Sequence, residues 1–155
     1  TSFDWFGGGI DVTPSKGDEK EKKEFHQTLQ DMCKRHNNKY YTKYKKWCDE
    51  YFYLPHRKEP RGIGGIFFDY KKNNFEKDFK FVRDVGITFQ IIFEKIIKKK
   101  FKKKWTLKDK EIQYIKRGRY AEFNLLYDRG TKFGLQTGGN IEGILMSLPP
   151  QAKWK

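Results

Sequence analysis

Apolar residues recur every three or four positions in several stretches of the chain, and this period predicts amphipathic helices. Asp18 followed by Glu21 has the pattern of a capping box and sets the start of the first helix. The longest helix has an apolar face that we expect to pack against the core, made by Phe75, Phe79, Val82, Phe89, Ile92 and Ile96. The predicted helices cover residues 18–35, 38–53, 75–101 and 106–116.

A strand is predicted at residues 1–13, where side chains alternate between two faces and three glycines interrupt the pattern. Phe6, Ile10 and Val12 share the face that we expect to meet the core. Trp5, Gly7 and Gly9 share the opposite face, which ends in the carboxylate of Asp11. Glycine weakens a strand, so the pattern indicates either a bulge with Asp11 capping a turn or the close approach of a ligand. Spacing alone leaves both open.

A second glycine-rich strand is predicted within residues 54–69, after a loop that carries His56, Arg57 and Arg61. The presence of two glycine-rich strands in one chain favours a common structural role over two unrelated bulges. We therefore expect their glycines to line one cavity, with these three side chains at its mouth.

The segment 117–150 predicts a three-stranded antiparallel meander. Residues 119–128 alternate, with Phe123 on an apolar face and Glu122 on a polar one, and turn residues follow at 128–130 and 137–140. A polar strand face is ordinarily solvated. Because of the glycine-rich strands and the nearby arginines, we expect this one to line a ligand site or a dimer contact.

Composition and charge restrict the function. The 155 residues suffice for a single domain, 1–155, and the core must rest on aromatic residues, which make up 17% of the chain. The net charge of +14 is compatible with a nucleic-acid-binding module. Lysines form tracts such as 98–104, which we interpret as solvated surface. Five of the seven arginines fall in the two most structured blocks, where their fork suits carboxylate recognition: Arg57, Arg61, Arg117, Arg119 and Arg129.

Several classes of protein lack support in the sequence. No apolar run reaches the length of a membrane helix and no signal peptide is evident, so we expect a cytoplasmic protein. Cys33 and Cys48 are interpreted as reduced structural thiols. The histidines do not have the spacing of a known metal motif, and neither a phosphate-binding loop nor a nucleophile elbow is present.

Four blocks of the chain together resemble one family, the oxygen-dependent coproporphyrinogen III oxidases of haem biosynthesis. They are WFGGGIDVTP at 5–14, the helix with His26, YKKWCDEYFYLPHRKEPRGIGGIFFD at 44–69, and RGRYAEFNLLYDRGTKFGLQTGGNIEGILMSLPP at 117–150. The blocks span nearly the whole chain in the family's order, and none is a generic motif. The chain resembles the central and C-terminal part of these enzymes.

This resemblance implies an α+β fold with a flat antiparallel β-sheet flanked by α-helices on both faces. It implies a homodimer whose contact region begins near Tyr120. The implied reaction is the decarboxylation of two propionates of coproporphyrinogen III to vinyls, with O2 as oxidant and protoporphyrinogen IX as product. The family needs no obligatory cofactor, and a divalent cation is left open.

The resemblance also implies site residues. Asp11 matches a carboxylate that engages the pyrrole N–H groups, His26 and His56 match active-site or divalent-cation histidines, and Gly138, Gly139 and Asn140 match a turn that contacts the substrate. As a hypothesis from the residue types, the propionates pair with Arg57, Arg61, Arg119 and Arg129.

The chain departs from the family's pattern in two respects. It lacks a preceding HPxNPxxPTxHxNxR-type motif, with its catalytic histidine, and a C-terminal segment, so the resemblance implies a partial chain. Asn140 also stands where some members have arginine. The alternatives to an enzyme are a non-catalytic porphyrin-binding or dimerisation fragment and, from another class, the nucleic-acid-binding module.

Overall fold

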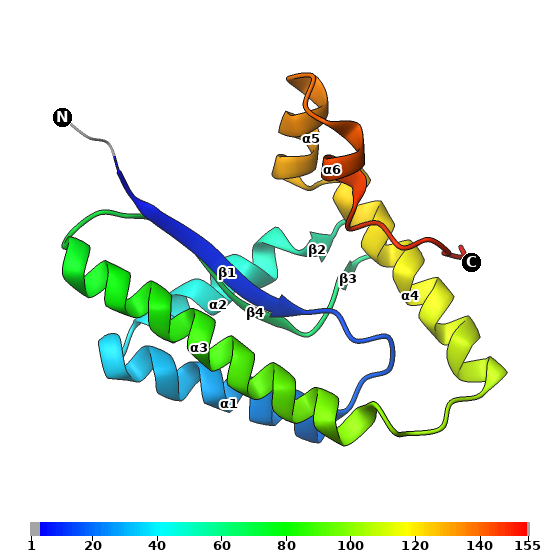
Figure 1. Ribbon diagram of the computed structural model, residues 1–155, viewed down its shortest axis with the longest axis horizontal. Coiled ribbons are helices and arrows are strands. Elements are labelled where there is room, and N and C mark those ends of the chain that lie inside the picture. Colours follow the sequence, from blue (N-terminus) through cyan, green and yellow to red (C-terminus); the bar gives the residue numbers. More distant parts are fainter. Residues whose placement is uncertain (1–3, 155) are drawn as a thin grey trace.

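The computed structural model describes residues 4–154 (Figure 1). Two long strands, two short ones and six helices follow one another in the order β1 (Phe6–Val12), α1 (Glu19–His36), α2 (Tyr40–Tyr51), β2 (Tyr53–Leu54), β3 (Glu59–Pro60), β4 (Gly64–Lys71), α3 (Phe75–Lys100), α4 (Leu107–Leu126), α5 (Arg129–Gln136) and α6 (Ile141–Leu145). The α+β class is confirmed. In Figure 1, α1 and α3 lie side by side below β1 and β4, whereas α4 to α6 form a second group beside them.

The two glycine-rich segments are strands of one antiparallel pair, β1 and β4. Ile10 lies opposite Ile66, and Asp11 lies opposite Gly65. The backbones approach so closely here that a Cβ added to Gly65 would lie 1.8 Å from the carbonyl oxygen of Ile10. A side chain at position 65 is therefore incompatible with this pairing, and one of the predicted glycine positions is explained by strand contact.

One face of the pair carries the core. Ile10, Ile66 and Phe68 are buried against side chains of α1, α2 and α3. Rings supply much of the contact, with Phe81 of α3 lying 5.0 Å from Phe68 and 5.8 Å from Tyr44 between ring centroids. Each fully buried side chain of this size contributes about 1.5–3 kcal/mol, so the aromatic core predicted from composition is present.

The opposite face of the pair is more open. Gly7 and Gly9 are exposed there, and the indole N–H of Trp5 donates a 2.9 Å hydrogen bond to Asp69. Residues 1–3 of the predicted first strand lie outside the described residues.

Local capping signals place the helices where the sequence predicts them. The Asp18 side chain accepts from the Glu21 amide at 3.0 Å, and α1 follows. The packing face of α3 is only partly as predicted, since Ile92 is buried but Phe75 and Phe79 are 66% and 48% exposed. The buried apolar residues of α3 are Phe81, Val85 and Ile92.

The predicted meander at 117–150 is wrong, because the segment folds as α4, α5 and α6. The helix predicted at 106–116 continues to Leu126. The side chains of residues 121–124 are all buried. In a strand with one solvent-exposed polar face, alternate side chains would be exposed, so four consecutive buried positions do not fit a strand. Glu122 and Asn124 are buried by polar contacts, so their polarity does not mark a solvent face.

The predicted turns are real but they begin helices. Asp128 caps α5 by accepting from the Thr131 amide at 2.6 Å, and Asn140 caps α6 by accepting from the Gly143 amide at 3.1 Å. Gly138 has φ 71°, and the Gly139 amide donates to the Gly134 carbonyl at 2.9 Å. This is the Schellman arrangement that ends a helix. The predicted polar strand face therefore does not exist.

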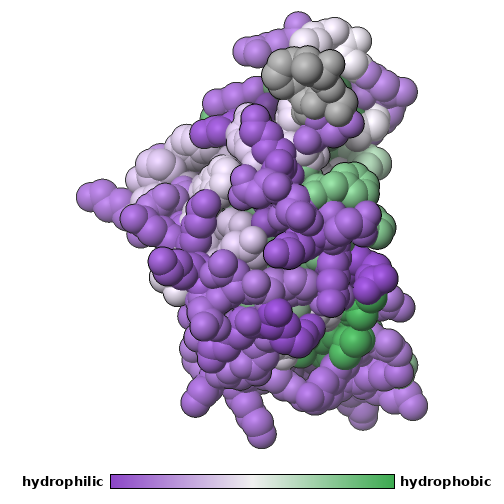
Figure 2. Space-filling model, turned by 90° about the vertical axis from the view of Figure 1, so that its left-hand side faces the viewer, coloured by the Kyte–Doolittle hydropathy of each residue, from purple (hydrophilic) through white to green (hydrophobic). Residues whose placement is uncertain are grey.

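The distribution of hydrophilic and hydrophobic side chains on one face of the molecule is uneven. Figure 2 shows one face on which hydrophilic side chains predominate, with the hydrophobic ones gathered along one margin. Across residues 4–154, no helix combines the length and the apolar character needed to cross a bilayer.

Candidate functional site

Asp11 and Arg61 form an ion pair at the end of β1. The carboxylate of Asp11, the residue before the last of the strand, accepts a hydrogen bond from the Arg61 guanidinium. The Arg61 side chain is only 7% exposed, and that of Asp11 is 23% exposed. Asp11 therefore keeps contact with solvent while its charge is balanced from the protein side.

Aromatic rings surround the guanidinium of Arg61. Its central carbon lies 4.0 Å from the ring centroid of Phe52, 4.8 Å from that of Phe123 and 5.0 Å from that of Tyr120. These contacts join the end of α2 to α4, and each adds cation–π attraction. Arg61 thus couples the position of Asp11 to the docking of α4.

A second polar cluster forms around Glu122 of α4. Arg57 binds its carboxylate with two hydrogen bonds, Nε at 2.9 Å and an NH2 group at 2.5 Å. The Nε2 atom of His56 lies 2.7 Å from the same carboxylate. Because a carboxylate only accepts, Nε2 carries the proton, and Nδ1 accepts from the hydroxyl of Tyr127 at 2.8 Å.

Arg119 joins this cluster from the same helix. It donates to Glu59 at 3.0 Å and, more weakly, to Glu122 at 3.4 Å. The Arg57 hydrogen bonds, followed by those of His56, hold the pKa of Glu122 at about 2 against an ordinary value of 4.5. Glu122 is therefore a carboxylate anion throughout the physiological range and fixes the three basic side chains.

His26 lies in a different environment, on α1. Its Nε2 atom lies 2.8 Å from the carbonyl oxygen of Ile63 and its Nδ1 atom 3.1 Å from the hydroxyl of Tyr41. Since a carbonyl only accepts, Nε2 carries the proton and Nδ1 accepts from Tyr41. Burial lowers the pKa of His26. The ring is thus neutral with both nitrogens occupied.

A cavity of about 380 Å³ connects His26 with Asp11. Gly62, Ile63 and Gly64 form part of its wall, together with Phe52. Glycines of the second strand segment thus border the same space as the carboxylate that ends the first strand. The expectation that glycines of both strands line one cavity is wrong for β1, because Gly7 and Gly9 lie on the open face and Gly8 lies against the ring of Phe68.

The other predicted site residues lie apart from these groups. Arg129 begins α5, and its guanidinium carbon lies 5.8 Å from the ring centroid of Tyr51. Gly138 and Gly139 join α5 to α6, and the side chain of Asn140 is occupied in capping α6. The structure brings Asp11 to Arg61, and His56 to Arg57 and Arg119.

The two histidines predicted as cation ligands make no common contact. Within residues 4–154 no group of three or more histidine, cysteine or carboxylate side chains could hold a metal ion. Both ring nitrogens of His26 and of His56 are taken by protein groups. This arrangement does not fit a cation held by either histidine, and metal binding there stays a prediction.

Three contributors were missed in the sequence. The predicted strand gives Glu122 a polar face without a partner and does not single out Tyr127, and Arg117 is only one of the motif arginines. Arg117 donates to the carbonyl of Thr13 at 2.7 Å and so ties α4 to the loop after β1. The helical spacing of Glu122 to Arg119, three residues apart, is the signal that could have found the cluster.

Comparison with known proteins identifies the family. A family profile described as coproporphyrinogen III oxidase matches residues 1–155. The chain belongs to the coproporphyrinogen III oxidase family. It is 57% identical over 155 residues to the oxygen-dependent coproporphyrinogen-III oxidases of Rickettsia rickettsii (strain Sheila Smith) and Rickettsia bellii (strain OSU 85-389), and 56% identical to that of Rickettsia akari (strain Hartford).

Each of these alignments covers 99% of this chain and 56% of the relative. The chain thus spans about half the length of the curated relatives it matches. The blocks that carry the family resemblance include Asp11, Arg61 and the Glu122 cluster, so the geometry described above belongs to the part that this coproporphyrinogen III oxidase family member shares with its relatives.

Proposed function

We propose that this chain, as part of the whole protein, catalyses the oxygen-dependent oxidative decarboxylation of two propionates of coproporphyrinogen III to vinyls, yielding protoporphyrinogen IX. The observation that carries the proposal is identity of 57% along nearly the entire chain to proteins with that activity in their names. For each propionate, a C–H bond of the carbon next to the pyrrole and the C–C bond to the carboxylate both break. The two electrons and the proton of the C–H bond, with one further proton from solvent, pass to O2, which becomes H2O2. CO2 leaves, and the electron pair of the broken C–C bond forms the vinyl double bond.

Asp11 is the residue that we propose to engage the macrocycle. A porphyrinogen has four pyrrole N–H donors and is rich in electrons, so a carboxylate beneath them both orients the ring and stabilises positive charge that develops as electrons leave. The ion pair with Arg61 supports this role, because it fixes the carboxylate at the edge of the cavity before substrate binds. Arg61 then acts as a positioning residue as well as a candidate propionate contact.

The arginines differ in their readiness to bind a propionate. Arg57 and Arg119 are bound to Glu122 and Glu59, so a propionate would have to share or replace those carboxylates. Arg129 is exposed and its guanidinium makes no ion pair among residues 4–154. We propose that Arg129 gives the first propionate contact and that the Glu122 cluster supplies a second, more rigid one.

The remaining predicted site residues have separate parts in the proposal. His56 is held by Glu122 through Nε2, and its Nδ1 can exchange a proton with Tyr127 or with a bound carboxylate. His26 supports the cavity wall through Ile63. Gly138 has open space beside it for a substrate edge, Gly139 lets the turn approach Gly134 and Ile144 closely, and Asn140 contributes through the helix that it caps.

We also propose a homodimer that acts in the cytoplasm with O2 as co-substrate, without an obligatory cofactor. The exposed apolar side chains of α5 and α6 support the dimer, because a monomer gains nothing from leaving them in water: Phe133, Leu135, Ile141 and Met146. Cys33 and Cys48 are both free and buried, which agrees with a reducing compartment.

The test uses the longer protein that carries the segments present in the relatives. Asp11→Asn keeps the size of the side chain and removes its charge, and we expect kcat/KM for coproporphyrinogen III to fall by about 10²–10³-fold. Asp31→Asn on α1, an exposed carboxylate, is the matched control. Product formation is followed by chromatography of the oxidised porphyrins. Near-normal turnover of Asp11→Asn would refute the role of Asp11.

The rival hypothesis is a porphyrin-binding or dimerisation protein without catalysis. It predicts that the unsubstituted longer protein binds coproporphyrin but releases no CO2 from the porphyrinogen under air. That result would remove the proposed reaction and leave the binding cavity intact.

A further inference from the structure

The segment from Phe101 to Lys108 turns the chain from α3 into α4, and all eight of its residues are exposed. Its sequence, FKKKWTLK, combines four lysines with three large apolar residues. Phe101, Trp105 and Leu107 are 66%, 68% and 81% exposed. We call this segment the 101–108 corner. Three apolar side chains this open make no contribution to the core.

Positive charge at the corner is left without internal partners. The three lysines just before it are each paired with a glutamate of α1 or α3. Within residues 4–154, in contrast, Lys103, Lys104 and Lys108 make no ion pair, and Lys102 lies 5.5 Å from the ring centroid of Phe101. These ammonium groups remain available to anions outside the chain.

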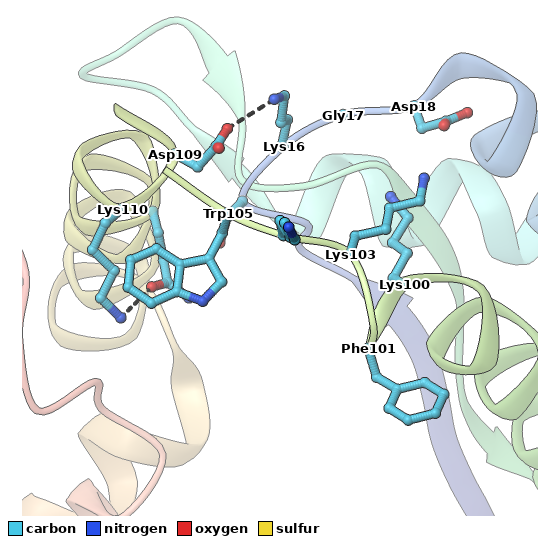
Figure 3. Close-up of a pocket in the computed structure, with 12 residues that line it drawn as sticks. Lys16, Gly17, Asp18, Lys100, Phe101, Lys103, Trp105, Asp109 and Lys110 are labelled. Carbon is cyan, nitrogen blue, oxygen red and sulfur yellow. Dashed lines mark hydrogen bonds and ion pairs between the residues drawn. The ribbon is translucent and has the colours of Figure 1, made fainter. Parts of the chain in front are cut away.

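A pocket of about 620 Å³ lies behind the corner, between it, the 15–18 loop and the start of α4 (Figure 3). Figure 3 shows Lys100 and Lys103 extending toward the 15–18 loop, while the ring of Phe101 extends the other way. Lys16 on the opposite wall is bound to Asp109 at 2.8 Å. Ammonium groups of the corner and Trp105 therefore line an open, basic hollow, while the ring of Phe101 extends to the other side.

We propose that the 101–108 corner docks the protein on a bilayer surface that contains anionic phospholipid. Trp and Phe enter the headgroup level of a bilayer, and neighbouring lysines bind the phosphates while their alkyl stems stay in the interface. The hollow behind the corner has room for a headgroup. The positive charge of the corner thus favours an anionic lipid surface, and the apolar side chains favour insertion into its headgroup layer.

Nucleic acid is the other polyanion that lysines attract, and its bases stack on aromatic rings. The corner fits it less well. Leu107 is the most exposed of the three apolar residues and has no ring on which a base could stack, whereas an acyl chain accepts it. This docking does not depend on the proposed reaction.

The test is sedimentation with vesicles of phosphatidylcholine, alone or with phosphatidylglycerol added, using both this chain and the longer protein that carries the segments of its relatives. We expect binding only to the anionic vesicles, and weaker binding as salt is raised. Substituting Lys102, Lys103 and Lys104 by Gln should weaken it by about fivefold for each charge removed. Substituting Phe101 and Trp105 by Ser should also release the protein.

The matched control removes the same charge elsewhere. Lys34, Lys39 and Lys43 are exposed at the other end of α1 and the start of α2, and their change to Gln should leave most vesicle binding intact. Vesicles should shift the Trp105 fluorescence to shorter wavelength, measured as the difference between the protein and its Trp105→Phe variant. Circular dichroism of every variant checks the fold.

Three results would overturn the proposal. They are equal binding to neutral vesicles, an equal loss of binding in the corner and control variants, and failure of the longer protein to bind. A single-stranded oligonucleotide that binds the corner more tightly than the vesicles do would assign the surface to nucleic acid instead.

Discussion

The guanidinium of Arg61 donates a hydrogen bond to the carboxylate of Asp11, so the proposed substrate-binding carboxylate is held by a buried cation. The two residues are 50 positions apart in the sequence. Because Arg61 also lies between rings of α2 and α4, the same side chain serves the site and the stability of the fold.

Arg61→Ala should destabilise this chain by about 2–4 kcal/mol, because it leaves Asp11 unpaired and opens space between Phe52 and Phe123. Urea unfolding followed by circular dichroism measures the change. Arg83→Ala is the control, since that arginine is exposed on α3 and should cost less than about 0.5 kcal/mol. Equal losses in the two variants would contradict the role given to Arg61.

Stability should fall in acid through Glu122. Its pKa is lowered from 4.5 to about 2 by the bonds from Arg57, so the folded state binds a proton less readily than the unfolded state. The contribution is complete above pH 4.5 and is lost as pH falls from there toward 2, and it amounts to about 3 kcal/mol.

The check on Glu122 is the free energy of unfolding measured across this pH range. Glu122→Gln should flatten the acid slope, whereas Glu50→Gln, at an exposed residue of α2, should leave it unchanged. An unchanged slope in Glu122→Gln would mean that another carboxylate is responsible.

His26 should titrate below an ordinary histidine. Burial lowers its pKa from 6.5, so its contribution to stability is present above pH 6.5 and is lost as pH falls through the lowered value. Nitrogen-detected NMR should find the proton on Nε2 at neutral pH. Tyr41→Phe removes the donor to Nδ1 and should raise the pKa. A proton found on Nδ1 would contradict the bond to Ile63.

The apolar surface of α5 and α6 should govern assembly. In the longer protein, Phe133→Glu or Met146→Glu should convert a dimer into a monomer, because each places a charge among side chains that are 69% and 83% exposed here. Light scattering after size exclusion gives the mass. Gln90→Glu on α3 is the charge control and should remain dimeric. A longer protein that is monomeric without any substitution would refute the dimer.

Sequence alone was sufficient where the signal is local. Asp18 with Glu21 predicts the start of α1, and the spacing of apolar residues predicts α2 and α3, because capping and amphipathicity act within a few residues. The four blocks also identified the family that the comparisons then showed.

Sequence was insufficient where burial depends on a distant partner. Arg57 and Glu122 are 65 positions apart, so their contact cannot be read from the sequence. A glutamate in a stretch of alternating polar and apolar residues then indicates a solvent-exposed face. Asp128 and Asn140 are equally suited to hairpin turns and to helix caps. The choice between strand and helix at 117–150 was therefore decided by packing against Phe52 and Tyr51, which no local pattern contains.

The contact between Gly65 and the Ile10 carbonyl predicts the outcome of a mutational scan. Any residue other than glycine at 65 should be depleted, since even alanine would force the two strands apart. Gly86 of α3 is exposed, and a Cβ added there would meet no other segment of residues 4–154 within 4 Å. Alanine at 86 should therefore be enriched by a gain of about 0.5–1 kcal/mol. Whether a glycine of this chain can be substituted thus depends on how close the neighbouring backbone lies. The codons that survive the scan would therefore report the spacing between the two strands.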